Sequence, residues 1–257
     1  MLKIVSNVAL KLALDAERGN VQVFLERLLV EVVSENYRYF ASEHLYYQRH
    51  EYDQPSTYCW PPLLANERQV SGLFATGLSR VCPVSRPEHS ISRTAKRDSE
   101  DLASPPKTGR VDFLAAYGSR HIALELKRCP IATIGDAKVK SGLEHQWSTV
   151  SAQAKNALVH MRDSGKDYDS PVSIGLLVIR ISRIVTKRRN PEDERLAAAE
   201  SLPIVVERIR QRTRADFLCY YTPPAEMQLS YGWGKGKDQY RVFPGVVFAA
   251  VVHGNTR

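Results

Sequence analysis

The chain has 257 residues, of which 43% are hydrophobic and 25% are charged, and its formal net charge is +8. This composition is typical of a soluble globular protein with one large domain, or one domain and an appendage, and the positive charge favours a polyanionic partner, most simply nucleic acid. Its four cysteines lie far apart without a Cys-x-x-Cys pair, which argues against a disulfide framework or a zinc site. No apolar stretch approaches the ~20 residues of a membrane span, and no signal-peptide pattern is present, so we expect a cytoplasmic protein.

The N-terminal region has the apolar spacing of helices. Apolar positions recur every three or four residues over 8–17 and again over 21–40, and the sequence Arg-Gly-Asn at 18–20 separates the two stretches. We therefore predict two helices with a break between them. They would form an N-terminal helical region, residues 1–60, ahead of an α/β domain that spans residues 61–257.

A further helix is predicted for residues 64–81. Glu67 lies three residues before Val70 and seven before Phe74, which places it on the apolar stripe of this helix. A carboxylate there is costly unless a partner stabilises it. Two alternatives follow: Glu67 is a first-turn residue favoured by the helix dipole, with Asn66 as the cap, or it faces a charged patch on neighbouring strands.

The composition changes between residues 83 and 108, where Ser, Pro and charged residues replace the large apolar ones. Residues 89–94 have a weak edge-strand pattern, and the rest is a polar loop of a length that is usually functional or disordered. Because this segment enters directly before the next strands, Arg93, Lys96 and Arg97 are placed to contact a nucleic-acid substrate.

Residues 109–128, GRVDFLAAYGSRHIALELKR, have the pattern of a β-hairpin, two alternating stretches joined by a short turn that contains Gly118. Side chains two residues apart share one face of a strand, so Glu125 and Lys127 point the same way, and strand pairing brings Asp112 near them. Two carboxylates and one ammonium group on one patch suit a divalent-metal site with an adjacent base. The alternative is a solvated ion pair, which contributes less than ~1 kcal/mol.

Two regular elements follow the hairpin, after a connector at 132–141. Residues 143–161 have an amphipathic helical pattern, with Gln146 and Gln153 near the borders of its apolar side. The run 172–181, VSIGLLVIRI, is apolar and rich in β-branched residues, as expected for a central strand. The predicted order is therefore helix, three strands, helix, strand.

The C-terminal part, residues 191–253, is predicted to add one helix and two strands. The helix spans 191–212 and is interrupted by Pro203. The strands span 215–221 and 245–252.

Two basic segments of this part of the chain are candidates for contacts with phosphate groups. One is a run of three basic residues and the other is a glycine-rich loop with two lysines. In each case the alternative is a solvated loop. The residues concerned are Lys187, Arg188, Arg189, Lys235 and Lys237.

The order of elements and the spacing of the hairpin charges resemble the PD-(D/E)XK nuclease superfamily, the fold of many restriction endonucleases, resolvases and repair nucleases. The matching residues are Asp112 and, after twelve intervening residues, Glu125-Leu126-Lys127, and the resemblance covers residues 64–182. Val111 stands where the family often has proline, a departure that many members share. The resemblance implies a restriction-endonuclease-like core, an α-β-β-β-α-β mixed sheet flanked by helices.

The resemblance also implies a set of metal ligands. Asp112, Glu125 and the Leu126 carbonyl would hold Mg²⁺ or Mn²⁺, since hard oxygen ligands suit these ions. Lys127 would orient or deprotonate the attacking water. Glu67 would complete a second metal position, or hold Lys127 or a water.

The helix after the hairpin often carries a glutamine in this family. Gln153 is the better match by its distance from Lys127, and Gln146 is the alternative. Either glutamine is also compatible with an ordinary position on the helix surface.

We therefore expect a metal-dependent nuclease that hydrolyses phosphodiester bonds in DNA, most simply an endonuclease. The alternative is a catalytically inactive nucleic-acid-binding or assembly subunit of a defence or repair system with the same fold. A homodimer would allow two such sites to cut both strands of a duplex.

Overall fold

The structure, a computed structural model, describes residues 2–4, 16–49, 61–64, 67–93, 107–132, 142–163, 168, 170–186, 189–231 and 239–254. Its helices are α2 (Ala16–Arg49), α4 (Glu67–Val81), α5 (Gly142–Asp163) and α6 (Pro191–Thr213), with the short 3₁₀ turns η1 (Pro62–Leu64) and η2 (Ala225–Met227). Its strands are β1 (Leu2–Ile4), β2 (Val84–Arg93), β3 (Lys107–Tyr117), β4 (Arg120–Ala132), β5 (Val172–Thr186), β6 (Phe217–Tyr221), β7 (Leu229–Tyr231) and β8 (Gln239–Gly254).

The described strands form one mixed sheet of eight strands, in the order β1-β6-β8-β5-β4-β3-β2, with β7 paired to β8. Among the described pairings only β4 with β5 is parallel, and α5 makes the crossover that a parallel pair requires. The predicted α/β class is confirmed, a mixed sheet flanked by helices. The predicted order of helix, three strands, helix and strand is also present, from α4 to β5.

Strand β5 is the predicted central strand, and it lies between β4 and β8. Every residue from 172 to 179 is buried because the strand is covered on both faces. The prediction of 172–181 is confirmed, and the strand continues to Thr186. Arg180 is the half-buried exception within this apolar run.

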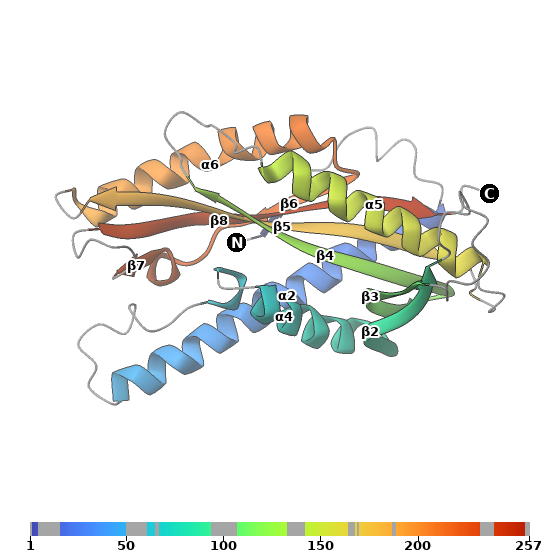
Figure 1. Ribbon diagram of the computed structural model, residues 1–257. Helices are drawn as coiled ribbons and strands as arrows, with labels where there is room; N and C mark the ends of the chain where they lie inside the picture. The colour runs from blue at the N-terminus through green and yellow to red at the C-terminus, as the bar shows by residue number, and fades with distance from the viewer. Residues whose placement is uncertain are drawn as a thin grey trace.

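Helices α2 and α4 cover one face of the sheet, and α5 and α6 cover the other (Figure 1). The apolar cluster under α2 and α4, the first core, includes Phe24, Phe74 and Leu126. The cluster under α5 and α6, the second core, includes Leu177 and Ile209. Burial of each such side chain contributes about 1.5–3 kcal/mol, so both layers are held by ordinary hydrophobic packing. Within the described ranges, no helix has the length and apolar content that a membrane crossing requires.

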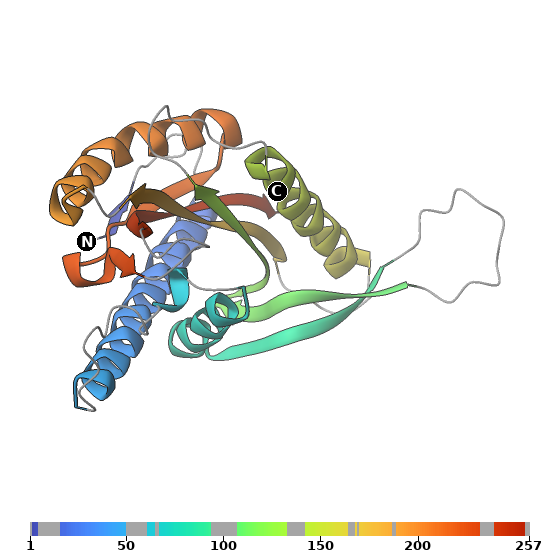
Figure 2. The same ribbon diagram turned by 60° about the vertical axis from the view of Figure 1, so that its left-hand side comes forward.

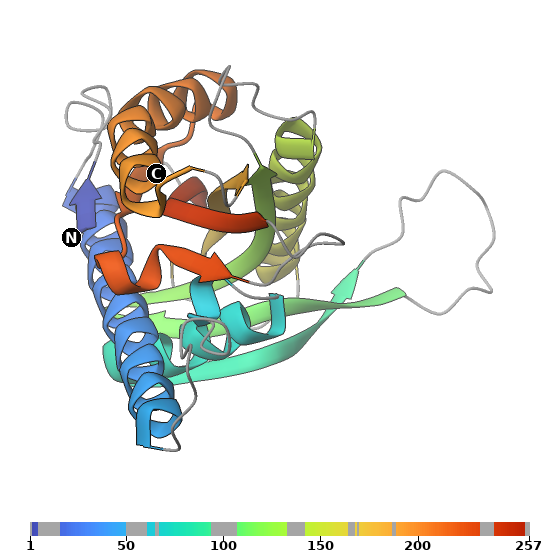
Figure 3. The ribbon, with the colours of Figure 1, turned by 90° about the vertical axis from the view of Figure 1, so that its left-hand side faces the viewer.

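The N-terminal helix corrects the sequence prediction. Helix α2 runs without interruption through 18–20, where a break was predicted, and it passes along α4 as the long helix of Figure 3. Packing of its buried face against α4 and the sheet outweighs the low helix propensity of the Gly-Asn pair. The predicted helical stretch 8–15 lies outside the described residues. Residues 2–4 form strand β1, which pairs with β6.

The C-terminal part also differs in two places. Helix α6 is continuous through Pro203, which is exposed, so the carbonyl group that loses its hydrogen bond faces solvent. Strand β7 was not predicted, because three residues are too short for a periodic pattern. The predicted strands 215–221 and 245–252 are present as β6 and β8, and β8 begins earlier, at Gln239.

The segment between α4 and the hairpin is more regular than predicted. The weak edge strand is the ten-residue β2, which lies at the edge of the sheet and pairs with β3. The pairing partner explains the difference, since an edge strand with polar residues has little periodic signal of its own. Residues 94–106, the rest of the predicted polar loop, lie outside the described part of the chain.

Candidate functional site: the fork of the β3–β4 hairpin

The predicted hairpin is confirmed, and its two strands are paired over only part of their length. Strands β3 and β4 pair from Tyr117–Arg120 at the turn to Phe113–Leu124. Beyond that pair, β3 continues alongside β2 and β4 continues alongside β5. Figure 2 shows β2 and β3 running together away from the rest of the sheet. The strands therefore diverge just where the predicted charged residues begin.

Asp112 ends the paired part of the hairpin. Its Oδ2 accepts a hydrogen bond of 2.7 Å from the backbone N–H of Leu126 on β4, two residues beyond the last β3–β4 pair. Burial raises the pKa of Asp112 above its usual range, and the Leu126 N–H and the Lys127 ammonium oppose this only in part. The charges of Glu67 and Glu88 raise this pKa further. Asp112 thus lies within electrostatic reach of both Lys127 and Glu67.

Lys127 and Glu67 meet across this divergence. The Lys127 Nζ lies 3.7 Å from Glu67 Oε1, and the two side chains are 25% and 57% exposed. An ion pair with this exposure contributes less than ~1 kcal/mol to stability. The contact therefore adds little to the stability of the fold, and its main effect is to direct the Lys127 side chain toward the start of α4.

The position of Glu67 corrects one prediction. The side chain is exposed, whereas the spacing to Val70 and Phe74 placed it on the buried stripe. The physical reason is that α4 begins at Glu67, so its first turn extends past the end of the first core. Both alternatives hold in part, since Glu67 lies in the first turn of α4 and also contacts Lys127 on the neighbouring strand.

Glu125 is the most buried of the charged site residues that the structure describes, with 2% exposure. Its register partner on β5 is Gly175, and residues paired in this way share a face of the sheet. A Cβ atom on Gly175 would lie 2.8 Å from the Val150 carbonyl oxygen and 3.2 Å from the Ala154 Cβ, both on α5. Helix α5 therefore packs directly over this part of the sheet, and Glu125 lies on the face that α5 covers.

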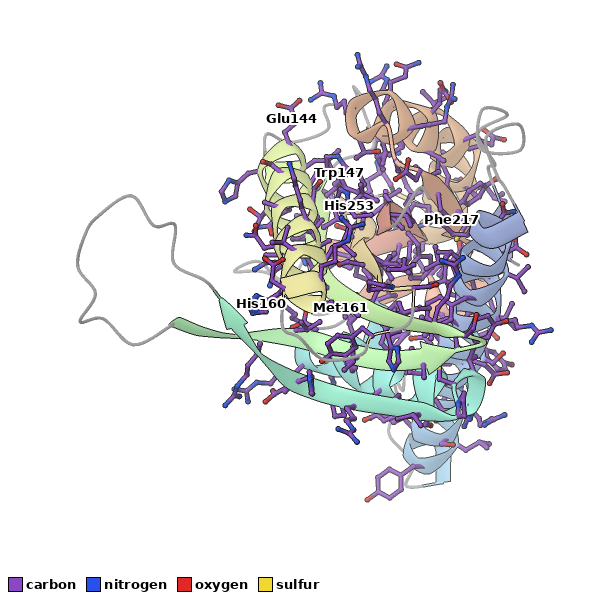
Figure 4. The ribbon with its side chains drawn as sticks, turned by 90° about the vertical axis from the view of Figure 1, so that its right-hand side faces the viewer. Glu144, Trp147, His160, Met161, Phe217 and His253 are labelled. Atoms are coloured by element: carbon purple, nitrogen blue, oxygen red, sulfur yellow. The ribbon has the colours of Figure 1, made fainter. Side chains whose placement is uncertain are left out.

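Gln153 belongs to the segment of α5 that packs over Gly175. It precedes Ala154, and its side-chain oxygen is buried and accepts no hydrogen bond from the described residues. Gln146, the alternative, lies seven residues nearer the start of the helix. The far end of α5 anchors the hairpin, since Met161, labelled in Figure 4, packs in one cluster with Val111 and Ala123.

Helix α5 agrees with the helix predicted for 143–161 to within two residues at each end. Its placement follows from its apolar side, which includes Val150, Ala154 and Ala157. The predicted glutamines are therefore held on a rigid element and not on a loop.

The predicted nucleic-acid contacts are described in part. Arg189 donates a 2.8 Å hydrogen bond to Glu194, which also pairs with Arg183 at 3.1 Å. This hydrogen bond raises the pKa of Arg189. Arg93 is the last residue of β2, and its side chain lies outside the described part of the structure. The remaining candidates also lie outside the described residues: Lys96, Arg97, Lys187, Arg188, Lys235 and Lys237.

Two arginines near the fork were not assigned by the sequence. Arg128 and Arg180 both donate hydrogen bonds to the Leu64 carbonyl oxygen of η1, next to the start of α4. Arg128 follows Lys127 in the sequence. Burial lowers the pKa of Arg128, and the carboxylate of Glu67 partly opposes this. The available signal was a charged residue within an otherwise apolar strand, at position 180.

The oxygen ligands at the fork suit a hard divalent cation. Two carboxylates, Asp112 and Glu125, flank the Leu126 backbone, and Mg²⁺ commonly binds one or two carboxylates and keeps several waters. Among the described residues, no group of three or more His, Cys, Asp or Glu side chains is arranged as a metal site. Burial raises the pKa of Asp112, and a bound cation would lower it.

Comparisons of the chain with protein-family models, curated proteins and solved structures found no match. The geometry and chemistry of the fork are therefore the basis for assigning a function.

Proposed function

We propose that this protein is a metal-dependent nuclease that hydrolyses phosphodiester bonds in DNA, with a restriction-endonuclease-like core. The observation that supports it is the electrostatic coupling of Asp112, Lys127 and Glu67 where β3 and β4 diverge, with the buried Glu125 two residues before Lys127 on the same strand. Three neighbouring elements, β3, β4 and α4, contribute these residues. The net charge of +8 fits a polyanionic substrate.

Each residue has a distinct role in this proposal. Asp112 and Glu125 would hold Mg²⁺ or Mn²⁺ together with the Leu126 carbonyl. When bound, the ion would stabilise the charge on the scissile phosphate and lower the pKa of a bound water. Lys127 would orient or deprotonate the attacking water. Glu67, 3.7 Å from Lys127, would hold its ammonium group toward the fork.

Helix α5 supports this arrangement from the covered side of the sheet. Gln153 lies over the strand that pairs with Glu125, and its buried side-chain oxygen makes no hydrogen bond to the described residues. It would receive a hydrogen bond from a water at the fork. This is the role of a positioning residue, and Gln153→Ala is expected to reduce cleavage less than the loss of Lys127.

The test is incubation of the purified protein with plasmid, linear duplex, single-stranded DNA and RNA, each with Mg²⁺, Mn²⁺ or excess EDTA. Conversion of plasmid to nicked and linear forms only with metal is the expected result, and it identifies an endonuclease. Lys127→Ala is expected to abolish cleavage, whereas Lys155→Ala, an exposed lysine on α5, retains it. Full activity in EDTA or in Lys127→Ala would contradict the proposal.

The second candidate is an inactive subunit of the same fold that binds nucleic acid or assembles with a defence or repair protein. It predicts salt-sensitive DNA binding without cleavage in any metal. The fork charges favour the enzyme, because a binding subunit has no requirement for both a buried Glu125 and an oriented Lys127.

A further inference from the structure

Three arginines from three neighbouring strands lie at one end of the first core. Arg128 is on β4, Arg180 on the adjacent β5 and Arg241 on β8, and all three are half-buried. Side-chain direction repeats every two residues along a strand, so each arginine lies on the same face of the sheet as the residue two positions before or after it. Those residues are all members of the first core: Leu126, Val178 and Phe243.

The polar contacts of Arg128 and Arg180 leave part of their hydrogen-bonding capacity unused. Arg128 and Arg180 share one acceptor, the Leu64 carbonyl oxygen, and the bond from Arg128 is long, at 3.4 Å. The Nε atoms of both are buried and have no hydrogen-bond partner among the described residues. Neither forms an ion pair with a described carboxylate. Arg180 also lies over the ring of Phe243, 5.6 Å from its centroid.

The cluster is electrostatically unfavourable as it stands. Burial, together with the charges of Arg128 and Arg241, lowers the pKa of Arg180 to about 10. Grouping half-buried like charges destabilises a fold. The guanidinium group presents donors in a planar fork that matches the oxygens of phosphate, so an anion of this kind would remove the penalty.

The cluster adjoins the fork. Glu67 lies 3.7 Å from the Lys127 ammonium, and its charge also acts on Arg128, the next residue of β4. Lys127 and Arg128 point to opposite faces of β4, so a strand of nucleic acid that contacts both groups would pass the start of α4, where Glu67 lies.

We infer that Arg128, Arg180 and Arg241 form a phosphate-binding site that holds one backbone phosphate of a nucleic-acid strand next to the fork. The identity of the strand as a substrate rests on the proposed function. The binding of phosphate rests on the arginine cluster alone. A free phosphate or mononucleotide has the same chemistry, and the experiment separates these sources.

The test is fluorescence anisotropy of a short labelled DNA, duplex and single-stranded, titrated with protein in EDTA so that no cleavage occurs. Arg180→Gln and the double variant Arg128→Gln/Arg180→Gln are expected to weaken binding about tenfold or more, as the loss of charge-assisted hydrogen bonds implies. The slope of log K against log salt should fall by about one per lost phosphate contact. The matched control is Arg212→Gln, which should change affinity far less. Arg212 is an exposed arginine of α6 paired with Glu144 of α5, in the helical layer on the opposite face of the sheet from the cluster.

Inorganic phosphate and a mononucleotide serve as competitors. Displacement of DNA only at millimolar competitor, with DNA affinity lost in Arg180→Gln, supports the inference. Tight competition by the small anion, with DNA affinity unchanged in Arg180→Gln, overturns it in favour of a free-phosphate site.

Thermal unfolding separates binding from a purely structural role. Without ligand, Arg180→Gln should unfold at the same or a higher temperature than the wild type, because it removes a repelled charge. A large fall in unfolding temperature together with unchanged DNA affinity would show that the cluster only anchors the Leu64 carbonyl. Arg180→Lys, which keeps the charge, provides a folded comparison that should retain part of the affinity.

The outcome is independent of the nuclease test. DNA binding that depends on Arg180, in a protein that never cleaves, would contradict the proposed function and leave the phosphate site in place. Metal-dependent cleavage with the same KM and DNA affinity in Arg180→Gln would support the proposed function and contradict the phosphate site.

Discussion

Two strand pairs of the sheet end in the same way, and only one of these ends gathers charged side chains. At both, an aspartate precedes the first backbone pair, and its carboxylate accepts a hydrogen bond from a backbone N–H group two residues beyond that pair. At the end of β3–β4, the Leu126 N–H donates to Asp112 Oδ2 over 2.7 Å. At the end of β6–β8, the Val252 N–H donates to Asp216 Oδ2 over 2.8 Å. Each aspartate begins an Asp-Phe-Leu sequence with a phenylalanine buried in the first core: Phe113 and Phe217.

The residues around these two ends differ. At the Asp112 end, the N–H donor is flanked by Glu125 and Lys127, and α4 adds Glu67. At the Asp216 end, Val251 and His253 occupy the flanking positions, and His253 is labelled in Figure 4. An aspartate that accepts a backbone hydrogen bond is therefore a structural way to end a strand pair. The chemistry proposed for the fork depends on the charges that surround only one of them.

The largest expected effect is on cleavage. Asp112→Asn should lower kcat by at least about a hundredfold, because it removes a proposed metal ligand worth several kcal/mol. Asp216→Asn alters the equivalent hydrogen bond and should leave kcat per folded molecule unchanged. The measurement is plasmid cleavage beside circular dichroism of each variant. Equal losses in both variants would show that the aspartates act only through the fold.

The next effect is on stability and should be equal at the two ends. Phe113 and Phe217 are 4% and 5% exposed and belong to the same core. Truncation of either to alanine should lower the free energy of unfolding by about 3–5 kcal/mol. Urea unfolding measures both values, with Leu196→Ala, on the exposed side of α6, as a control that should change little. A much smaller loss for Phe113→Ala would mean that the hairpin is not part of the core.

A smaller effect concerns pH. The pKa of Asp112 is raised, so the folded protein binds more protons than the unfolded chain between the ordinary and the raised value. The free energy of unfolding should therefore fall as pH rises through that window and stay lowered at neutral pH. In Asp112→Asn this fall should be absent, and in Asp216→Asn it should remain.

Added Mg²⁺ tests the same carboxylate. In the wild type at neutral pH, the unfolding temperature should rise with Mg²⁺ concentration, by mass action on the folded state. The rise should disappear in Asp112→Asn and persist in Asp216→Asn. In the pH experiment, a difference in the free energy of unfolding between the wild type and Asp112→Asn that does not change with pH would argue against the raised pKa.

The smallest effect concerns how the strands are connected. A tight turn joins β3 and β4, with Gly118 at φ 58° and open space around it, whereas η2 and β7 lie between β6 and β8. Gly118→Ala should cost about 1 kcal/mol, because a Cβ disfavours the left-handed conformation. Gly72→Ala in helix α4, also in open space, should instead stabilise by up to about 1 kcal/mol. Calorimetry of the two variants should give shifts of opposite sign.

The elements around the fork could be predicted because their signals are local. Alternation and a glycine turn gave the hairpin, and a β-branched apolar run gave β5. The proximity of Asp112 to Lys127 followed from strand pairing alone. The exposure of Glu67 could not be predicted, since it depends on where α4 begins relative to the core.

The arginine cluster could not be predicted for a different reason. Arg128, Arg180 and Arg241 are distant in the sequence and meet because β8 inserts beside β5. Likewise, the repeated Asp-Phe-Leu sequence is visible in the chain, but its equivalent pairing depends on two different partner strands. Non-local pairing decides both features.

Gly175 lies in register with Glu125 on one side and Val251 on the other, midway between the charged end and the uncharged end. Because it has no side chain, the backbone of α5 rests on the sheet at this point. A methyl group at position 175 would come too close to the Val150 carbonyl oxygen and would push α5 away from the sheet, and so away from Glu125. Position 175 therefore sets the height of the helix layer over the fork, and it offers a way to adjust that height without altering any charged residue.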